Sequence, residues 1–264
     1  MHLNMEYTSI KFSIEKNVGI IKLNRPDVLN SFNRDMALAF QHVLDECTHN
    51  PLVRAILITG EGRAFCAGQD LAEVISSEGP ELQRIVKEHY NPIVLKIRTV
   101  EKPVVCAVNG VAAGAGANIA LACDITLAGK SASFIQAFSK IGLIPDSGGT
   151  FTLPRLVGIQ KASALMMLGE KISASDAEKM NMIYKSIDDD QLMNEAVLLA
   201  QKLAAMPTKA IGLTKRALNK SMINNLNSQL DLEEELQTEA GKSFDYNEGV
   251  KAFLKKRPPI FKGE

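Results

Sequence analysis

Apolar and polar positions recur with two different periods along the first half of the chain. Residues 7–17 and 18–26 form two strand-like runs separated by a turn near Asn17 and Gly19. Residues 31–50 carry apolar side chains at helical spacing, which predicts an amphipathic helix that ends at Asn50-Pro51. Its expected buried face consists of Met36, Phe40, Val43, Leu44 and Cys47. Short apolar runs at 53–60, 102–110 and 123–129 are typical of buried strands.

Segments with helical periodicity separate these strands, and the last part of the chain has helical periodicity only. Residues 80–100 predict a helix with a break near Pro92, and strands alternating with helices indicate an α/β fold with buried, largely parallel strands. The last strand-like run is 183–188, and the chain beyond about residue 190 shows helical periodicity throughout. We therefore expect a core over 1–195 and an all-helical region over 196–264.

Composition narrows the class of protein. The 264 residues are 46% hydrophobic and 23% charged, as in ordinary globular proteins, and 30 basic residues balance 30 acidic ones. A zero net charge disfavours general binding to nucleic acid. Four scattered cysteines without a CxxC pair predict reduced thiols. With no apolar run of about 20 residues and no targeting segment at the N-terminus, we expect a cytoplasmic protein without membrane contact.

Several kinds of site are disfavoured by missing motifs. His42 and His49 lie seven residues apart without an HExxH motif or a carboxylate cluster, so no metal site is expected. No G-x-S-x-G elbow marks a serine hydrolase. The glycines at 114 and 116 are not completed to GxGxxG because residue 119 is Ile119, and no GxxxxGK[ST] occurs.

Two glycine turns and one isolated carboxylate remain as candidate chemistry. The first turn, "GEGRAFCAGQDL", directly follows the strand-like run at 53–60, and the second, "NGVAAGAGANIALACD", directly follows that at 102–110. Such turns expose backbone N–H groups, and in the second a helix begins at once, with its positive dipole end. Brought together, they would offer two donors to one oxygen, an oxyanion hole. Asp146, in "IPDSGG", stands alone between Pro145 and a Gly-Gly pair.

Five motifs in order along almost the whole chain resemble the crotonase, or enoyl-CoA hydratase/isomerase, family. They are "LNRPDVLNSFN", "AFCAGQDL", "KPVVCAVNGVAAGAGANIALACDI", "IGLIPDSGGTFTLPRLVG" and "DYNEGVKAFLKKRPPIF". The resemblance implies a crotonase-like spiral of ββα units with a C-terminal all-helical trimerisation region, and hence a homotrimer or a dimer of trimers. It implies an acyl-CoA thioester as substrate, with coenzyme A as part of that substrate and no other cofactor.

The resemblance also assigns roles to residues. The oxyanion-hole donors would be the backbone N–H groups of Gln69 and Ala115. The two glutamates with which enoyl-CoA hydratases activate water correspond here to Asn118 and Phe138, and neither side chain can act as a base. The hydratase machinery is therefore expected to be missing, although an enoyl-CoA hydratase of fatty-acid β-oxidation remains the alternative function.

Asp146 occupies a position that is catalytic in several family members that are not hydratases. We expect Phe138, Ile144 and Phe151 to surround it and so to raise its pKa. Such a base would move a proton between two carbons, a double-bond isomerisation; the competing interpretation is a helix cap. The motifs most resemble the subgroup acting on ring-1,2-epoxyphenylacetyl-CoA in phenylacetate degradation. A dehalogenase is disfavoured because the chain has no tryptophan, and a non-catalytic CoA- or RNA-binding homologue is a less favoured alternative.

The remaining residues follow from the resemblance as a group that binds coenzyme A or the acyl chain. Arg25 would meet the phosphates at the entrance, with Phe253 and Lys256 added from the C-terminal helix of this or a neighbouring subunit. Asn91 would line the acyl pocket. The backbone around the first and second turns would flank the ligand at Ala64, Cys66, Ala67, Gly68 and Gly114. Cys66 is expected to be a small apolar residue and not a nucleophile, and Asp70 a helix cap.

Overall fold

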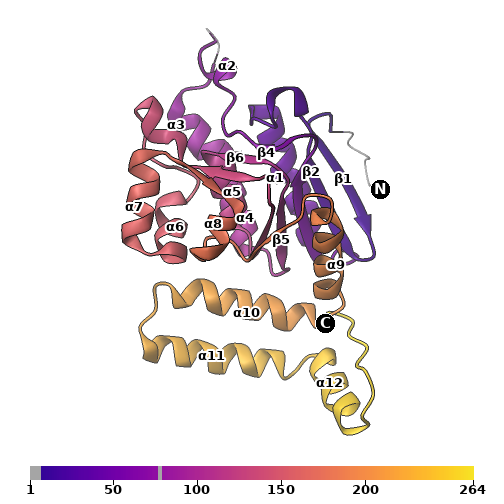
Figure 1. Ribbon diagram of the computed structural model, residues 1–264. Coiled ribbons are helices and arrows are strands. Elements are labelled where there is room, and N and C mark those ends of the chain that lie inside the picture. The colour runs from indigo at the N-terminus through magenta and orange to yellow at the C-terminus, as the bar shows by residue number, and fades with distance from the viewer. Residues whose placement is uncertain (1–6, 77–78) are drawn as a thin grey trace.

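A six-stranded sheet forms the centre of the molecule (Figure 1); the computed structural model describes residues 7–76 and 79–264. Its strand order is β1-β2-β3-β5-β7-β10, with β1 antiparallel to β2 and all other neighbours parallel. The strands are β1 (Ile10–Glu15), β2 (Val18–Leu23), β3 (Ala55–Gly60), β5 (Val104–Val108), β7 (Ile125–Gly129) and β10 (Lys185–Ile187). The predicted N-terminal strand pair and the three buried strands are confirmed.

A second sheet is made of four three-residue strands, β4 (Ala64–Cys66), β6 (Val111–Ala113), β8 (Ser133–Ile135) and β9 (Lys171–Ser173), in the order β4-β6-β8-β9. Strands β3, β5 and β7 of the large sheet each lead directly into β4, β6 and β8 of the small one. Each turn of the chain thus adds one strand to the large sheet and one to the small sheet. This arrangement is the predicted spiral of ββα units.

Helices fill the space between the turns of the spiral. They are α1 (Arg34–His49), α2 (Leu71–Val74), α3 (Leu82–Arg84), α4 (Asn91–Thr99), α5 (Ala115–Ala122), α6 (Gly149–Val157), α7 (Ile159–Leu168) and α8 (Ala174–Lys179), with 3-10 turns at Pro26–Val28 and Ala137–Ile141. The predicted buried face of α1 is confirmed, and Asn33 caps that helix by accepting from the Met36 N–H. The predicted break near Pro92 is a π-helical segment, Ile85–Tyr90, that leads into α4.

Helix α9 (Leu192–Ala204) crosses the boundary predicted at residue 195. Its buried residues Leu192, Ala196, Ala200 and Ala204 belong to the same apolar cluster as Leu57 and Val105 of the large sheet. The sheet-packed core therefore continues to the end of α9, because the small side chains of that helix let it lie close against β3 and β5.

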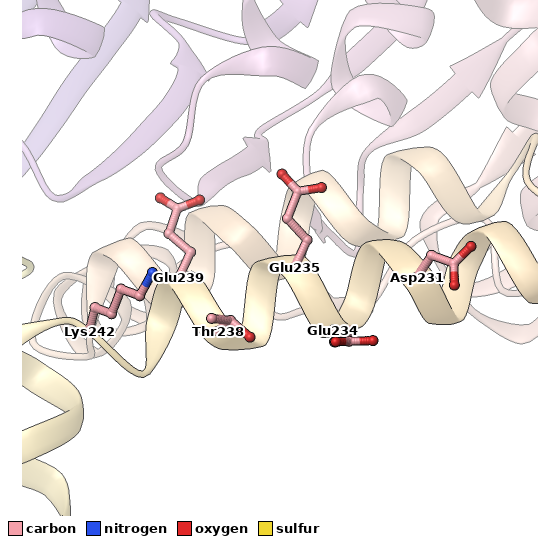
Figure 2. A pocket seen from close by; sticks show the side chains of 6 residues that line it. All are labelled: Asp231, Glu234, Glu235, Thr238, Glu239 and Lys242. Carbon is pink, nitrogen blue, oxygen red and sulfur yellow. The ribbon is translucent and has the colours of Figure 1, made fainter.

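Helices α10 (Thr208–Ser221), α11 (Leu226–Ala240) and α12 (Phe244–Leu254) extend below the sheets in Figure 1. A hollow of about 490 Å³ runs along α11 (Figure 2) and is lined by Asp231, Glu234, Glu235, Thr238, Glu239 and Lys242. Of the side chains of α11, only Leu236 is buried. Among the helices described, none is both long and apolar enough to cross a membrane.

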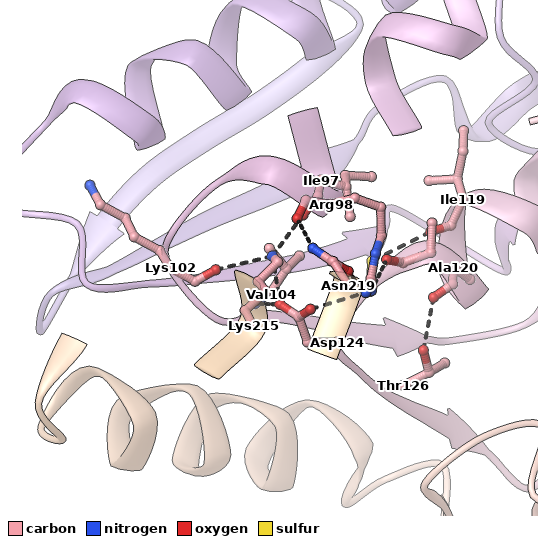
Figure 3. A network of polar contacts seen from close by, with 12 residues as sticks. Ile97, Arg98, Lys102, Val104, Ile119, Ala120, Asp124, Thr126, Lys215 and Asn219 are labelled. Carbon is pink, nitrogen blue, oxygen red and sulfur yellow. Dashed lines mark hydrogen bonds and ion pairs between the residues drawn. The ribbon is translucent and has the colours of Figure 1, made fainter. Parts of the chain in front are cut away.

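A buried ion pair attaches α10 to the core (Figure 3). The Lys215 side chain is 6% exposed, and its Nζ lies 2.7 Å from Asp124 Oδ2 and 2.7 Å from the Ile97 carbonyl oxygen, to which it donates. Asp124 Oδ2 also accepts from the Val104 N–H at 2.9 Å. Arg98 joins the same network, lying 3.4 Å from Asp124 and donating to Asn219 of α10.

Candidate active site

The small sheet places the two glycine turns side by side. Strands β4 and β6 are parallel neighbours, so their carboxyl ends lie at one edge, and Gly68 and Gly114 come just after them. A Cβ at Gly68 would lie 2.9 Å from the Ala113 carbonyl oxygen and 3.7 Å from the Ala115 nitrogen. The prediction that each turn directly follows the strand-like run before it is wrong. Short strands intervene, and their pairing brings the turns together.

In the part of the chain that the structure describes, the backbone N–H groups of both predicted oxyanion donors have no hydrogen-bond acceptor. The Phe32 N–H donates to the Gly68 carbonyl at 2.7 Å and the Asp70 N–H donates to the Phe32 carbonyl at 2.9 Å, which leaves the Gln69 N–H between them without a partner among the described residues. The Ala115 N–H opens α5 and is likewise unpaired within that part of the chain. Every residue of α5 is buried, so solvent screens its positive end little. This edge is suited to a negatively charged oxygen.

Asp146 lies in a strained turn before α6. Ser147 and Gly148 both have positive φ, 51° and 73°, and Ser147 Oγ donates to Asp146 Oδ1 at 2.8 Å. Burial raises the pKa of the Asp146 carboxyl, and the Ser147 hydroxyl opposes that rise. Among the ion pairs of the described residues, none involves Asp146. The helix-cap interpretation is not supported, because no side chain caps α6.

Asn118 joins α5 to the Asp146 turn. Its Nδ2 donates to the Asp146 carbonyl oxygen at 2.8 Å, and its Oδ1 accepts from Gln136 Nε2 at 2.8 Å. A Cβ at Gly149 would lie 2.4 Å from Asn118 Nδ2, so the turn and the amide pack closely. Asn118 comes one helical turn after Ala115, which places the Asp146 turn beside the second donor.

The expected surroundings of Asp146 are only partly present. Phe138 is buried, and its ring would lie 3.7 Å from a Cβ at Gly114, so it covers the second glycine turn. The prediction for Ile144 and Phe151 is wrong within this chain: they are 81% and 46% exposed. The Arg155 guanidinium lies over the Phe151 ring, 3.7 Å from its centroid.

The predicted ligand-binding residues near the first turn occupy the β4 edge. Ala64 and Cys66 are buried within β4, and burial raises the pKa of the Cys66 thiol to about 12, so Cys66 is no nucleophile. Ala67 donates its N–H to the Leu29 carbonyl. Cys66 Sγ accepts from the Gly68 N–H at 3.4 Å.

Arg25 contacts Asp70, which lies in the first turn, and Asn91 lies in α4. Arg25 Nη2 lies 2.9 Å from Asp70 Oδ2, and Nη1 donates to the Ser31 carbonyl, so protein contacts hold the guanidinium in place. Asp70 caps α2 by accepting from the Ala72 N–H at 3.1 Å, as predicted. Asn91 begins α4 and is exposed.

Phe253 and Lys256 do not meet this site within one chain. Phe253 is 84% exposed on α12, and Lys256 follows that helix. Figure 1 shows α12 at the bottom of the molecule and α2 at the top. The predicted role of both residues therefore requires a neighbouring subunit. The α11 hollow of Figure 2 contains none of the predicted site residues, and its carboxylates would repel phosphates.

Two side chains near the site, Tyr90 and Glu73, were not predicted from the sequence. Tyr90 is buried and its hydroxyl donates to Gln69 Oε1 at 2.7 Å, while Gln69 Nε2 donates to Glu73 Oε2 at 2.9 Å. The spacing of Gln69 and Glu73, four residues apart across the start of α2, could have suggested the second contact. Tyr90 comes from a distant segment, and no local pattern marks it.

The histidines of the described residues give no sign of a metal site. His89 is buried, both its ring nitrogens lack a hydrogen-bond partner within residues 7–76 and 79–264, and burial lowers its pKa. His49 bonds to the Asp45 carbonyl oxygen one turn earlier in α1. Over residues 7–76 and 79–264, no group of three or more His, Cys, Asp or Glu side chains is arranged to hold a metal ion. His2 lies outside the described residues.

The family model described as enoyl-CoA hydratase/isomerase matches residues 13–264, nearly the whole chain. The chain belongs to the enoyl-CoA hydratase/isomerase family. A crystal structure of an enoyl-CoA hydratase from Bacillus anthracis superposes with a TM-score of 0.90 at 31% identity, covering 97% of this chain and 100% of that one.

Relatives within the family carry different names. The 1,2-epoxyphenylacetyl-CoA isomerase of Escherichia coli (strain K12) is 48% identical, over 95% of this chain and 97% of its own length. The short-chain-enoyl-CoA hydratase of Clostridium acetobutylicum is 32% identical, over 96% and 97% respectively. The comparisons thus support an enzyme of this family and leave open the choice between isomerase and hydratase.

Proposed function

We propose that this protein is an acyl-CoA isomerase in which Asp146 moves one proton and the backbone N–H groups of Gln69 and Ala115 hold the thioester oxygen. The observation that carries the proposal is a half-buried carboxyl of raised pKa beside two N–H donors that have no partner among the described residues. A carboxylate with that environment is a stronger base than an exposed aspartate.

In this mechanism a 3-enoyl thioester binds with its carbonyl oxygen between the two donors. The Asp146 carboxylate takes a proton from C2, and the electrons of the broken C–H bond form an enolate whose oxygen the two N–H groups stabilise. The Asp146 carboxylic acid then returns the proton to C4. The double bond moves from C3=C4 to C2=C3, and no water is consumed.

Two other residues near Asp146 and the second turn, Asn118 and Phe138, argue against hydration. Adding water across a double bond needs a group that activates the water, and Asn118 has its amide and its oxygen engaged by the Asp146 carbonyl and by Gln136. Phe138 is a hydrocarbon ring packed on Gly114. Neither side chain can take up a proton as a general base. The finer substrate we propose is a ring-epoxide phenylacetyl-CoA, a 3-enoyl-CoA, or both; the 48% identical isomerase from Escherichia coli supports the first.

Product analysis tests the proposal. Wild-type protein is incubated with 3-hexenoyl-CoA and, separately, with crotonyl-CoA, and the products are separated and weighed by mass spectrometry. We expect 2-hexenoyl-CoA of unchanged mass from the first and no mass gain of one water from the second. Rapid hydration of crotonyl-CoA would show that another group activates water and would favour the hydratase.

We further propose that α11 and α12 carry contacts between subunits. Leu226, Leu230, Phe253 and Leu254 are all more than half exposed, a concentration of apolar side chains that suits burial in a trimer or a dimer of trimers. A solution mass equal to the single 28.7 kDa chain, measured by light scattering, would contradict this.

A further inference from the structure

Gln69, whose backbone N–H is the first proposed oxyanion donor, has its side chain held by a chain of hydrogen bonds that joins three separate elements. Tyr90 OH donates to Gln69 Oε1 at 2.7 Å, and Gln69 Nε2 donates to Glu73 Oε2 at 2.9 Å. The other oxygen of Glu73 accepts from the Arg34 N–H at 2.9 Å. The Gln69 side chain is thereby held between the π-helical segment, α2 and the start of α1.

Phe32 restrains the same residue from the backbone side. Its N–H and carbonyl bond to Gly68 and Asp70, the residues on either side of Gln69. Its ring packs edge-on against Tyr90, with centroids 5.9 Å apart and planes at 66°. Phe32 thus fixes both the peptides that flank the donor and the ring whose hydroxyl holds the donor's side chain.

Tyr90 is well suited to remain a donor in this position. It is 1% exposed and ends the π-helical segment, so its ring has little freedom. Burial raises the pKa of Tyr90 well above its usual value, and the nearby negative charge of Asp146 contributes to the rise. The phenol therefore stays protonated at neutral pH.

We propose that Tyr90 is a positioning residue of the oxyanion hole. Through its bond to Gln69 Oε1 it fixes the orientation of Gln69 and so aims the Gln69 N–H at the oxygen on which negative charge develops. The proposal deepens the proposed function and rests on it for the identity of that oxygen. Mispositioning of a donor affects the enolate more than the bound ground state.

The test is Tyr90→Phe, which removes the hydroxyl and keeps the ring against Phe32. Loss of one neutral hydrogen bond should lower kcat on 3-hexenoyl-CoA about 5–10-fold, with KM changed by less than about twofold. Tyr184→Phe is the matched control, because Tyr184 is 68% exposed. A wild-type kcat in Tyr90→Phe would overturn the proposal.

A double-variant cycle separates positioning from general damage. Gln69→Met keeps the backbone donor and removes the acceptor of the Tyr90 hydroxyl. If Tyr90 acts through Gln69, the double variant loses no more activity than the more affected single variant. Multiplied losses in the double variant would show that Tyr90 acts independently of Gln69 and would overturn the proposal.

A binding measurement distinguishes failure of this inference from failure of the proposed function. Acetoacetyl-CoA forms an enolate with its own ultraviolet absorbance, and an oxyanion hole increases the bound enolate fraction. Tyr90→Phe should weaken enolate formation about 5–10-fold while butyryl-CoA binds as to wild type. If wild type fails to isomerise 3-hexenoyl-CoA and this difference persists, the proposed function fails and the role of Tyr90 stands. Equal enolate formation in both proteins overturns the role of Tyr90.

Discussion

Replacing Asp146 by asparagine is expected to lower kcat/KM on 3-hexenoyl-CoA by about 10²–10⁴-fold, the usual contribution of a positioned acid–base group. The amide keeps the size of the carboxyl but takes up no proton. Steady-state kinetics on purified protein measure the loss. Asp190→Asn, a change at an exposed carboxylate, is the matched control and should retain full activity. Activity within about twofold of wild type in Asp146→Asn would remove Asp146 from the mechanism.

The pH dependence follows from the direction of the Asp146 pKa. Because burial raises the pKa of the Asp146 carboxyl above its ordinary value of 3.8, wild-type kcat/KM should fall on acidification at a pH above the ordinary aspartate range. A group of raised folded-state pKa favours the folded protein below its unfolded pKa and loses that contribution as the pH rises through the folded value. At neutral pH, Asp146→Asn should therefore melt no lower than wild type, which separates lost chemistry from unfolding.

Removing Asp124 is expected to cost about 3–5 kcal/mol of the free energy of unfolding, since it leaves the ammonium of Lys215 buried without its partner. Asp124→Ala should therefore show a clearly lower denaturant midpoint than wild type. Burial already lowers the pKa of Lys215, and Asp124 opposes that change. The deficit should shrink as the pH rises, because a deprotonated Lys215 no longer needs a counter-charge.

The control for Asp124→Ala is an ion pair on the surface with a similar distance between its charged atoms. Lys130 Nζ and Asp188 Oδ1 lie 2.7 Å apart, but their side chains are 62% and 65% exposed. Lys130→Ala should leave the denaturant midpoint almost unchanged, because water screens such pairs. Equal losses in Asp124→Ala and Lys130→Ala would contradict the view that burial makes the Lys215 pair important for attaching α10.

Elements long enough to repeat a pattern were predictable from the sequence. The amphipathic face of α1 and the buried runs of β3, β5 and β7 lie where the pattern placed them. The strands of the small sheet are three residues each, too short to show a period of two. The pairing of β4 with β6 brings the two donors together. No local sequence pattern indicates this pairing, so the relative position of the donors could not be predicted.

The site was predictable in its backbone chemistry and less so in its side-chain environment. The turns of Gly68 and Gly114 lie together as the two-donor hypothesis requires. The desolvation of Asp146 was anticipated, but Ile144 and Phe151 do not supply it, because proximity along the chain does not decide on which face a side chain lies. Tyr90 reaches Gln69 across 21 residues, a contact that only the tertiary fold creates.

The most direct test of a one-carboxylate isomerisation follows the fate of the proton itself. 3-Hexenoyl-CoA deuterated at C2 is converted by wild-type protein in ordinary water, stopped early, and the 2-hexenoyl-CoA product is examined for deuterium at C4. Because Asp146 is half-buried and serves both transfers, the account predicts that part of the deuterium removed from C2 reappears at C4. A product whose new C4 hydrogen comes entirely from water would show that no deuterium is carried directly from C2 to C4 and would contradict the account.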